Sequence, residues 1–298
     1  MDMPIISGRY GKSKVSVFRI FKSPYASSKW RNILDCEVEV ILEGNFEECY
    51  TQGDNSRIVP TDTIKNICYI VARNSEATTI EDYAVALANF FLQTYSHIMG
   101  VNVSVEETLW QRLPVQGKPH VHTFTQNGLE KRTSVCVIYR DGAVTLSSGI
   151  KNLRILKATQ SGFEGFWTDE YTTLKPADDR VFCTDITASW MYGNRTSEMD
   201  FKKIVKQIRQ ILLQTLAGPP HQGEYSKSVQ ETLYKMSNAV LAECPYVEAI
   251  TMSLPNIHHF EYNIERFNLV NNNEILFRSE KPAGLIECTV RRGPRSRL

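Results

Sequence analysis

The chain has 298 residues, of which 42% are hydrophobic, and this length suits one large domain or two domains of medium size. Its 34 Lys and Arg residues nearly balance 33 Asp and Glu residues, which argues against a nucleic-acid binder because such proteins carry a marked basic excess. No apolar run approaches the roughly 18 residues that a membrane-spanning helix needs, so we expect no membrane partner.

Two strands are expected near the N-terminus. Residues 13–20 place Val15 and Val17 at a period of two, and residues 35–43 alternate apolar with acidic side chains more regularly. Such alternation is typical of a half-buried antiparallel strand. The apolar face of the second strand consists of Cys36, Val38, Val40 and Leu42.

Two helices follow. Apolar residues recur at helical spacing from Ile64 to Val71. A longer helix is expected to begin after Thr79, with Asp82 three residues on as in a capping box, and to end at Gly100. The apolar stripe of this helix is Ile80, Tyr83, Ala84, Leu87, Phe90, Phe91, Tyr95 and Ile98. Strand patterns resume over residues 101–105, 120–124 and 133–139.

The same order of patterns then occurs a second time. A strand is expected over residues 181–192, a helix over 201–216 and a second helix over 228–243, which Cys244-Pro245 would end. Strands over 247–254 and 260–264 complete the second pass. The sequence therefore predicts an α+β protein with two equivalent units, in which paired helices cover one face of each antiparallel sheet.

We expect the first unit to span residues 9–142 and the second unit residues 143–290, followed by a tail over 291–298. The stretches 23–31 and 266–274 are expected to be loops. The tail ends in Ser296-Arg297-Leu298, a conservative variant of the Ser-Lys-Leu peroxisomal signal, which predicts a peroxisomal location and an import receptor as a partner.

The cysteine pattern and the N-terminus agree with an intracellular protein. The seven cysteines are scattered and form no Cys-x-x-Cys pair, which indicates reduced, buried thiols. Residues 1–4 are not a basic segment followed by an apolar stretch, so no signal peptide is expected. The cysteines are Cys36, Cys49, Cys68, Cys136, Cys183, Cys244 and Cys288.

Two local patterns leave alternatives open. His120 and His122 share one face of an expected strand, where they either ligate a metal or, as we favour, form ordinary hydrogen bonds. Thr61 or Asp62 either caps the helix that follows or presents its hydroxyl and nearby amides to an anionic ligand. Nucleotide-binding glycine loops and the Gly-x-Ser-x-Gly elbow do not occur.

Eight segments of the sequence resemble the urate oxidase family, in order and over essentially the whole chain. They are residues 9–12, 54–56, 60–66, 162–166, 169–174, 179–180, 228–234 and 254–258. The resemblance implies two tandem T-fold units per chain, a tunnel-shaped homotetramer, and active sites shared between neighbouring subunits. Asn256 and His258 match the family pattern, but Ile257 between them stands where many members carry a polar residue.

The resemblance also implies roles for particular residues. Arg180 would grip the urate anion with its guanidinium fork, and Gln230 would pair with the adjacent purine edge. Phe163 would stack on the ring and Leu174 would line the pocket. The backbone amides near Asp62 and Val229 would complete substrate recognition.

For the reaction, the resemblance implies that O₂ is a co-substrate and that no metal or flavin takes part. Asn256 and Thr61 would hold O₂ or water, while Lys12, Thr61 and His258 would form a proton relay. The implied products are 5-hydroxyisourate and H₂O₂.

Three other functions compete with this interpretation. A different T-fold enzyme acting on a purine or pterin would typically carry a carboxylate where Gln230 stands. A catalytically silent purine-binding protein would lack the relay residues, which are intact here. A metal-dependent oxidase using His120 and His122 is the weakest of the three.

Overall fold

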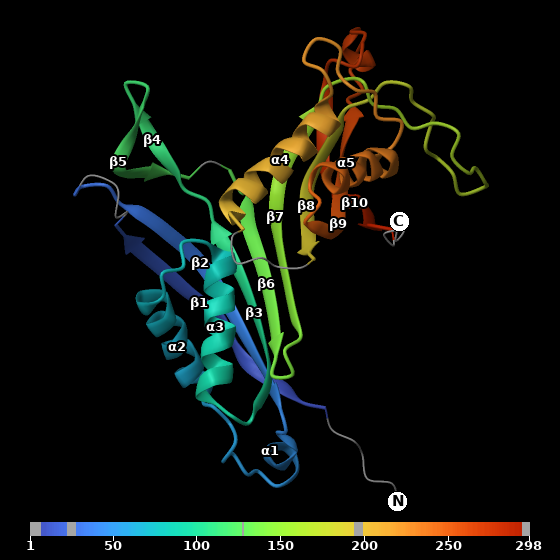
Figure 1. Ribbon diagram of the computed structural model, residues 1–298. Coiled ribbons are helices and arrows are strands. Elements are labelled where there is room, and N and C mark those ends of the chain that lie inside the picture. The colour runs from blue at the N-terminus through green and yellow to red at the C-terminus, as the bar shows by residue number, and fades with distance from the viewer. Residues whose placement is uncertain (1–6, 23–27, 127, 194–198, 294–298) are drawn as a thin grey trace, which may run out of the picture. The chain divides into compact units, whose positions relative to one another are not determined.

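The computed structural model describes residues 7–22, 28–126, 128–193 and 199–293. The chain divides into two compact units, Met1–Gly149 and Ile150–Leu298. Each unit contains antiparallel strands and a pair of long helices (Figure 1). No helix in the described part of the chain is long and apolar enough to cross a membrane.

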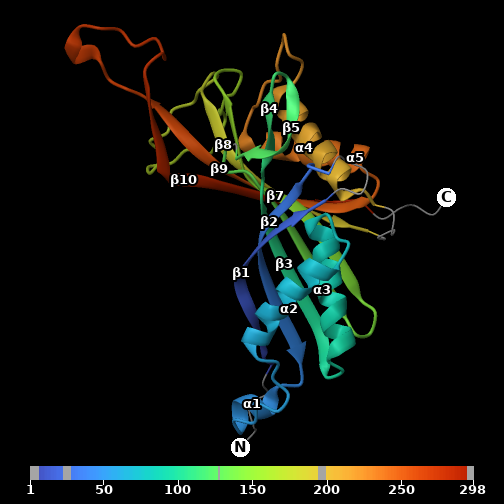
Figure 2. The same cartoon turned by 90° about the vertical axis from the view of Figure 1, so that its left-hand side faces the viewer.

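The first unit has a sheet with the strand order β1-β2-β3-β6, and α2 and α3 lie side by side on one face of it (Figure 2). A separate hairpin is formed by β4 and β5. The elements are β1 (Arg9–Phe21), β2 (Asn32–Gly44), α1 (Glu47–Thr51), α2 (Thr61–Asn74), α3 (Ile80–Thr94), β3 (Ile98–Thr108), β4 (Gln111–Val115), β5 (Lys118–Thr125) and β6 (Lys131–Tyr139).

The second unit repeats this plan with the strand order β7-β8-β9-β10, and α5 packs on β9 and β10. The boundary between the units falls within β7 (Val144–Lys157). The other elements are β8 (Phe182–Tyr192), α4 (Phe201–Ala217), α5 (Val229–Glu243), β9 (Val247–Glu261), the short 3₁₀ helix η1 (Glu265–Phe267) and β10 (Leu276–Arg291).

Alternation along the strands and helical stripes builds the core of each unit. In β2 the alternate residues from Cys36 to Leu42 are buried, as the sequence predicts, and Leu34 extends this buried face. In α3 the predicted stripe from Ile80 to Phe91 is buried against the sheet, with Phe90 at its edge. This burial of apolar surface is the main favourable term in folding each unit.

Hydroxyl caps begin the second helix of each unit. Thr79 Oγ1 accepts a hydrogen bond from Asp82 N (3.2 Å), and Ser228 Oγ accepts one from Glu231 N (3.1 Å). Each bond satisfies one of the amides that the first turn of a helix leaves without a partner. The predicted start at Thr79 is therefore confirmed.

An arginine fixes the other end of each of these helices. In both units its side chain donates to three carbonyls at the junction between helix and strand, over 2.6–3.2 Å. The bonds run from Arg140 to Leu92, Tyr95 and Ile98, and from Arg292 to Leu241, Cys244 and Val247. The carbonyls of Leu92 and Leu241, which lie in the last turns of these helices, thereby gain a charged donor.

The prediction that the second helix ends at Gly100 is wrong. The helix ends at Thr94, and both Ile98 and Gly100 belong to β3. The apolar residues after Tyr95 fit a helical spacing and a strand spacing equally well, and the Arg140 bonds fix the earlier end. Gly100 instead lets the strands approach, because a Cβ there would lie 2.7 Å from the Tyr139 ring.

The strands of the second unit also differ from the prediction. The two segments expected at 247–254 and 260–264 form one continuous strand, β9, which ends at Glu261. Pro255 interrupts the pattern in the sequence but still pairs with Leu285 in the sheet. The strands β7 and β10 were not predicted, since their exposed and buried residues do not alternate simply.

Candidate active site

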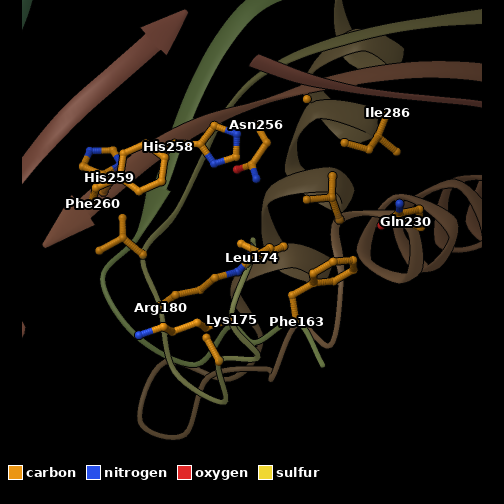
Figure 3. Close-up of a pocket in the computed structure, with 14 residues that line it drawn as sticks. Phe163, Leu174, Lys175, Arg180, Gln230, Asn256, His258, His259, Phe260 and Ile286 are labelled. Carbon is orange, nitrogen blue, oxygen red and sulfur yellow. The ribbon is translucent and has the colours of Figure 1, made fainter. Parts of the chain in front are cut away.

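A pocket of about 390 Å³ lies in the second unit (Figure 3). The structure brings together seven of the residues that the sequence predicts for a site: Phe163, Leu174, Arg180, Val229, Gln230, Asn256 and His258. The other lining residues are Lys175, Ala177, Val181, His259, Phe260, Gly284 and Ile286. The lining is mostly apolar with a few polar groups, as in small-molecule sites.

The segment that carries Arg180 is held on both sides. The Asp179 carboxylate accepts hydrogen bonds from Thr159 Oγ1 (2.9 Å) and Gln160 N (3.0 Å). The backbone of Arg180 donates to Ser161 O at 2.7 Å. The start of the Arg180 side chain is therefore fixed before any ligand binds.

The guanidinium of Arg180 is suited to an anion. Burial lowers the pKa of Arg180, yet an arginine stays charged at any physiological pH. Its Nε is buried and has no hydrogen-bond partner within the described residues, and its Cζ lies 5.3 Å from the centre of the Phe163 ring. A buried cationic donor without an acceptor is costly, so this arrangement favours a ligand with acceptor atoms.

Phe163 stands at the base of a loop. Its backbone exchanges two hydrogen bonds with Ala177, of 2.7 and 3.1 Å, which close the loop formed by residues 164–176. The Phe163 ring stacks on Phe166 with centroids 5.0 Å apart. Leu174, on this loop, is about half exposed while it lines the pocket.

Next to Gly162, at this base, there is no room for a larger residue. A Cβ at that position would lie 2.1 Å from Tyr225 Oη and 2.9 Å from Ala177 O. Tyr225 Oη in turn donates to Asp178 O at 2.7 Å. The loop base and the Arg180 segment are therefore packed together.

The start of α5 supplies polar groups to the pocket. Val229 is the first helical residue and is 4% exposed, and Gln230 is the second. The Ser228 cap binds the amide of Glu231, so it does not use the amides of Val229 and Gln230. The amides of a first helical turn have no partner inside the helix, and together with the helix dipole they favour a negatively charged or electron-rich ligand here.

Asn256 and His258 reach the pocket from one face of β9, because alternate residues of a strand point the same way. Burial, the charge of Arg180 and the neighbouring His259 lower the pKa of His258. This ring is therefore biased towards its neutral form, which can both accept and donate a proton. Gly284 of β10 pairs with Asn256 and leaves the pocket open at this point.

Ile257 lies on the opposite face of β9 and is 4% exposed. It packs in the core and does not line the pocket. The sequence leaves the role of this residue open, and its burial explains why an apolar side chain is accepted there.

The predicted catalytic and binding residues that remain belong to the first unit and do not line this pocket. Lys12 lies in β1 and is half-buried, and Thr61 and Asp62 form the first turn of α2. Pro60 occupies the cap position and no side-chain cap forms, so the alternative in which Thr61 or Asp62 caps the helix is wrong. Ser296, Arg297 and Leu298 lie outside the described residues.

Electrostatics connect these residues of the first unit. Asp62 forms an ion pair with Lys65 and accepts a hydrogen bond from Asn66 (3.2 Å). Lys65 is the main cause that lowers the pKa of Asp62, and the charge of Lys12 adds a smaller contribution in the same direction. Lys12 and the start of α2 are therefore within electrostatic range of each other.

The two histidines of β5 form local contacts. His120 Nδ1 accepts hydrogen bonds from the backbone of Thr123 (3.1 Å) and His122 (3.3 Å), and the two rings meet edge to face. Among the residues that the structure describes, no group of three or more His, Cys, Asp or Glu side chains has a metal-binding arrangement. These bonds favour the interpretation of His120 and His122 as ordinary hydrogen-bonded side chains.

Sequence reasoning missed seven lining residues. His259 and Phe260 adjoin His258, and Lys175 and Ala177 adjoin the predicted Leu174 segment, so proximity along the chain is a usable signal for them. Gly284 and Ile286 come from β10, whose pairing with β9 the sequence does not reveal.

Comparison with known proteins agrees with the composition of this pocket. The family model described as Uricase matches residues 8–137 and 146–287. Uricase from Dictyostelium discoideum is 40% identical over 97% of both chains, and uricase from Oryctolagus cuniculus is 38% identical over 100% of this chain and 97% of the rabbit chain. The crystal structure of uricase from Arthrobacter globiformis, which is 34% identical, has a TM-score of 0.89 and covers 99% of this chain and 98% of that chain. The chain therefore belongs to the uricase family and is an oxidoreductase of that family.

Proposed function

We propose that the protein oxidises urate with O₂ and water to 5-hydroxyisourate and H₂O₂. The observation that carries the proposal is the half-buried Arg180 side chain, whose buried Nε has no partner within the described residues, in a pocket that Phe163 and Gln230 also line. A flat, anionic heterocycle with acceptor atoms on its edge complements these three groups. Membership of the uricase family supports urate as that heterocycle.

Each binding group would contribute in a different way. Arg180 would neutralise the urate anion, and Gln230 would donate to and accept from the adjacent edge of the purine. The amides at the start of α5 would add donors on the same side. The ring of Phe163 would stack on the purine.

The reaction would remove two electrons and add one oxygen atom to the substrate. Urate, O₂ and H₂O contain the same atoms as 5-hydroxyisourate and H₂O₂, so nothing further is consumed. Doubly deprotonated urate is electron-rich enough to reduce O₂ itself, and we propose that no metal or flavin takes part. The protein would supply deprotonation, confinement and stabilisation of charge.

The proton relay would consist of Lys12, Thr61 and His258. The Thr61 hydroxyl would pass a proton between the ligand or water and Lys12. The neutral form of His258, which its lowered pKa favours, would orient Lys12 and exchange its proton with solvent. Asn256 would hold O₂ or water above the ring. We further propose that Lys12 and Thr61 reach the pocket of a neighbouring subunit in a homotetramer, as the family resemblance implies.

A peroxisomal location completes the proposal. The Ser296-Arg297-Leu298 end resembles a peroxisomal signal, and a reaction that releases H₂O₂ suits that compartment. Fusing the last residues of the chain to a fluorescent protein would test this part separately. Diffuse fluorescence in place of punctate peroxisomal fluorescence would contradict it.

One assay tests the chemistry. The purified protein is dialysed exhaustively against a chelator and mixed with urate, and urate absorbance, O₂ and H₂O₂ are followed together. We expect equal molar losses of urate and O₂ and an equal gain of H₂O₂. An absence of turnover would contradict the proposed reaction, whereas turnover that disappears with chelation and returns with a metal would contradict only its cofactor-free form.

The relay can be tested by Lys12→Met. We expect kcat to fall by about 10²–10⁴ because a proton-transfer group is lost, while the affinity for an unreactive urate analogue changes little. Lys22→Met, which changes an exposed lysine just beyond β1, is the matched control and should behave as wild type. Equal losses of kcat and analogue affinity would show that Lys12 binds substrate and does not move protons.

A further inference from the structure

In each unit, the second long helix and the strand after it can be aligned with their counterparts in the other unit residue by residue. The capped helices α3 and α5 both have 15 residues and begin 149 positions apart, at Ile80 and Val229. The strands β3 and β9 that follow also begin 149 positions apart, at Ile98 and Val247. The pairing of β2 with β3 skips Met99, and the pairing of β8 with β9 skips Glu248, which is again 149 positions later.

The last strands of the units, β6 and β10, can be aligned in the same way. The two arginines that fix the helix ends, Arg140 and Arg292, bind carbonyls at corresponding positions. Eight residues before them stand Arg132 and Gly284. Sheet pairing gives the same match, because Arg132 lies opposite Glu107 and Gly284 lies opposite Asn256.

Three pocket residues of the second unit therefore have counterparts in the first. Gln230 corresponds to Glu81, and Asn256 corresponds to Glu107. Gly284, which leaves the pocket open, corresponds to Arg132. The two neutral amides are replaced by carboxylates, and the glycine is replaced by the longest cationic side chain.

The side chain of Arg132 occupies this place in the first unit. Its Nη2 lies 2.8 and 2.9 Å from the two carboxylate oxygens of Glu81, and its Nη1 lies 3.2 Å from Oε2 of Glu107. Ser148 Oγ also donates to Glu81, at 2.6 Å. The Glu81 side chain is fully buried and that of Arg132 is 10% exposed.

We propose that the first unit contains a second ligand site that is filled by its own arginine. The site is specific for a planar cation with several N–H donors, such as a guanidinium or amidinium group. Carboxylates on two elements match such a fork, just as Arg180 with neutral amides matches an anion in the second unit. The guanidinium of Arg132 is thus an internal ligand tethered from β6.

Arg132→Gly tests this, because it installs the residue that stands at the corresponding position of the second unit and removes the tethered ligand. Methylguanidinium is the probe, and thermal unfolding of the whole protein is the readout. We expect low-millimolar methylguanidinium to raise the midpoint saturably, by on the order of 2 °C at about tenfold its Kd. Wild type should show no rise, and methylammonium, which lacks the fork, should give a much smaller one.

Arg132→Gly with Glu81→Gln is the second arm, and it should lose the methylguanidinium effect because one carboxylate is gone. If Arg132→Gly alone does not fold, the yield of refolded protein is measured in the presence of methylguanidinium and, separately, of methylammonium. A yield that only methylguanidinium restores supports the site. A folded variant without a saturable rise, or equal yields with both cations, overturns the proposal, and neither result bears on the oxidation of urate.

Discussion

The helices α3 and α5 make the same contacts at their C-terminal ends and different contacts at their N-terminal ends. At their C-terminal ends, Arg140 and Arg292 bind corresponding carbonyls. At their N-terminal ends, one helix presents Glu81 to a buried arginine and the other presents Gln230 to an open pocket. The fold thus fixes where a site can form, and a few side chains decide whether the position becomes core or pocket.

The two ends also differ in how their charges are satisfied. Arg132 has carboxylate partners inside the fold, whereas Arg180 keeps a buried Nε without one. A buried ion pair contributes little net stability compared with apolar packing, but breaking it leaves an uncompensated charge. Variants that alter one charge at a time therefore probe the difference between the units directly.

The largest effect is expected for Glu81→Gln. This change removes a buried carboxylate that faces Arg132, and we expect it to lower the free energy of unfolding by about 3 kcal/mol. Urea denaturation measures the loss. The control is Glu106→Gln, which breaks the more exposed pair between Glu106 of β3 and Lys131 of β6 and should cost about 1 kcal/mol or less. Equal losses for the two variants would mean that burial of Arg132 is irrelevant.

Arg180→Ala should act on binding instead of stability. Loss of a charged, bidentate donor is expected to weaken an unreactive urate analogue by about 10²-fold, measured by calorimetry. Because wild-type Arg180 has a donor without a partner, the variant should unfold no more easily than wild type. Arg154→Ala is the control, since Arg154 pairs with Asp185 and Glu280 and does not line the pocket. Tight analogue binding by Arg180→Ala would remove the main support for the proposed substrate.

Gln230→Glu gives α5 the residue that α3 carries. A carboxylate in this place would repel an anionic ring and accept where the amide donates, so we expect analogue affinity to fall by about 10-fold to 10²-fold. Raising the pH from 6 to 8 should weaken binding further, because the carboxylate loses any remaining proton. Gln207→Glu, on the surface of α4, is the control. Unchanged affinity would show that Gln230 does not contact the ligand.

The smallest effect concerns the pKa of His258. Burial and then the charge of Arg180 lower this pKa, so Arg180→Gln should raise it towards the ordinary value. A histidine whose pKa is lower in the folded state binds fewer protons there than in the unfolded chain. It therefore opposes folding as the pH falls below the unfolded pKa of about 6.5, and the variant should reduce this penalty. Nuclear magnetic resonance titration of the ring measures the change, and a downward shift would contradict it.

Local rules predicted much of the fold. The alternation of apolar and acidic residues predicts β2, because every second side chain from Leu34 to Leu42 is buried. The hydroxyl caps Thr79 and Ser228 mark the starts of α3 and α5. The rules fail where two periods fit the same residues, as after Tyr95, and where exposure on both faces hides a strand, as in β10.

The site divides in the same way. Phe163, Arg180 and Gln230 lie in segments whose resemblance to a family is visible in the sequence, and the structure brings them together. The place of Gly284 opposite Asn256 depends on strand register, and the pairing of Arg132 with Glu81 joins residues 51 positions apart; no local pattern encodes either. The filled site of the first unit is therefore invisible until the two sheets are aligned.

The Phe163 loop, residues 164–176, has a fixed base and an exposed tip. Phe163 and Ala177 exchange two backbone hydrogen bonds, and beyond them Trp167 and Tyr171 are 85% and 82% exposed. Because the backbone bonds of Phe163 and Arg180 lie outside this exposed tip, the residues around Trp167 and Tyr171 can vary while Phe166 still stacks on Phe163. Grafting a new tip between Phe166 and Leu174 is thus a route to changing which molecules reach the pocket, because it leaves the lining residues Leu174 and Lys175 in place.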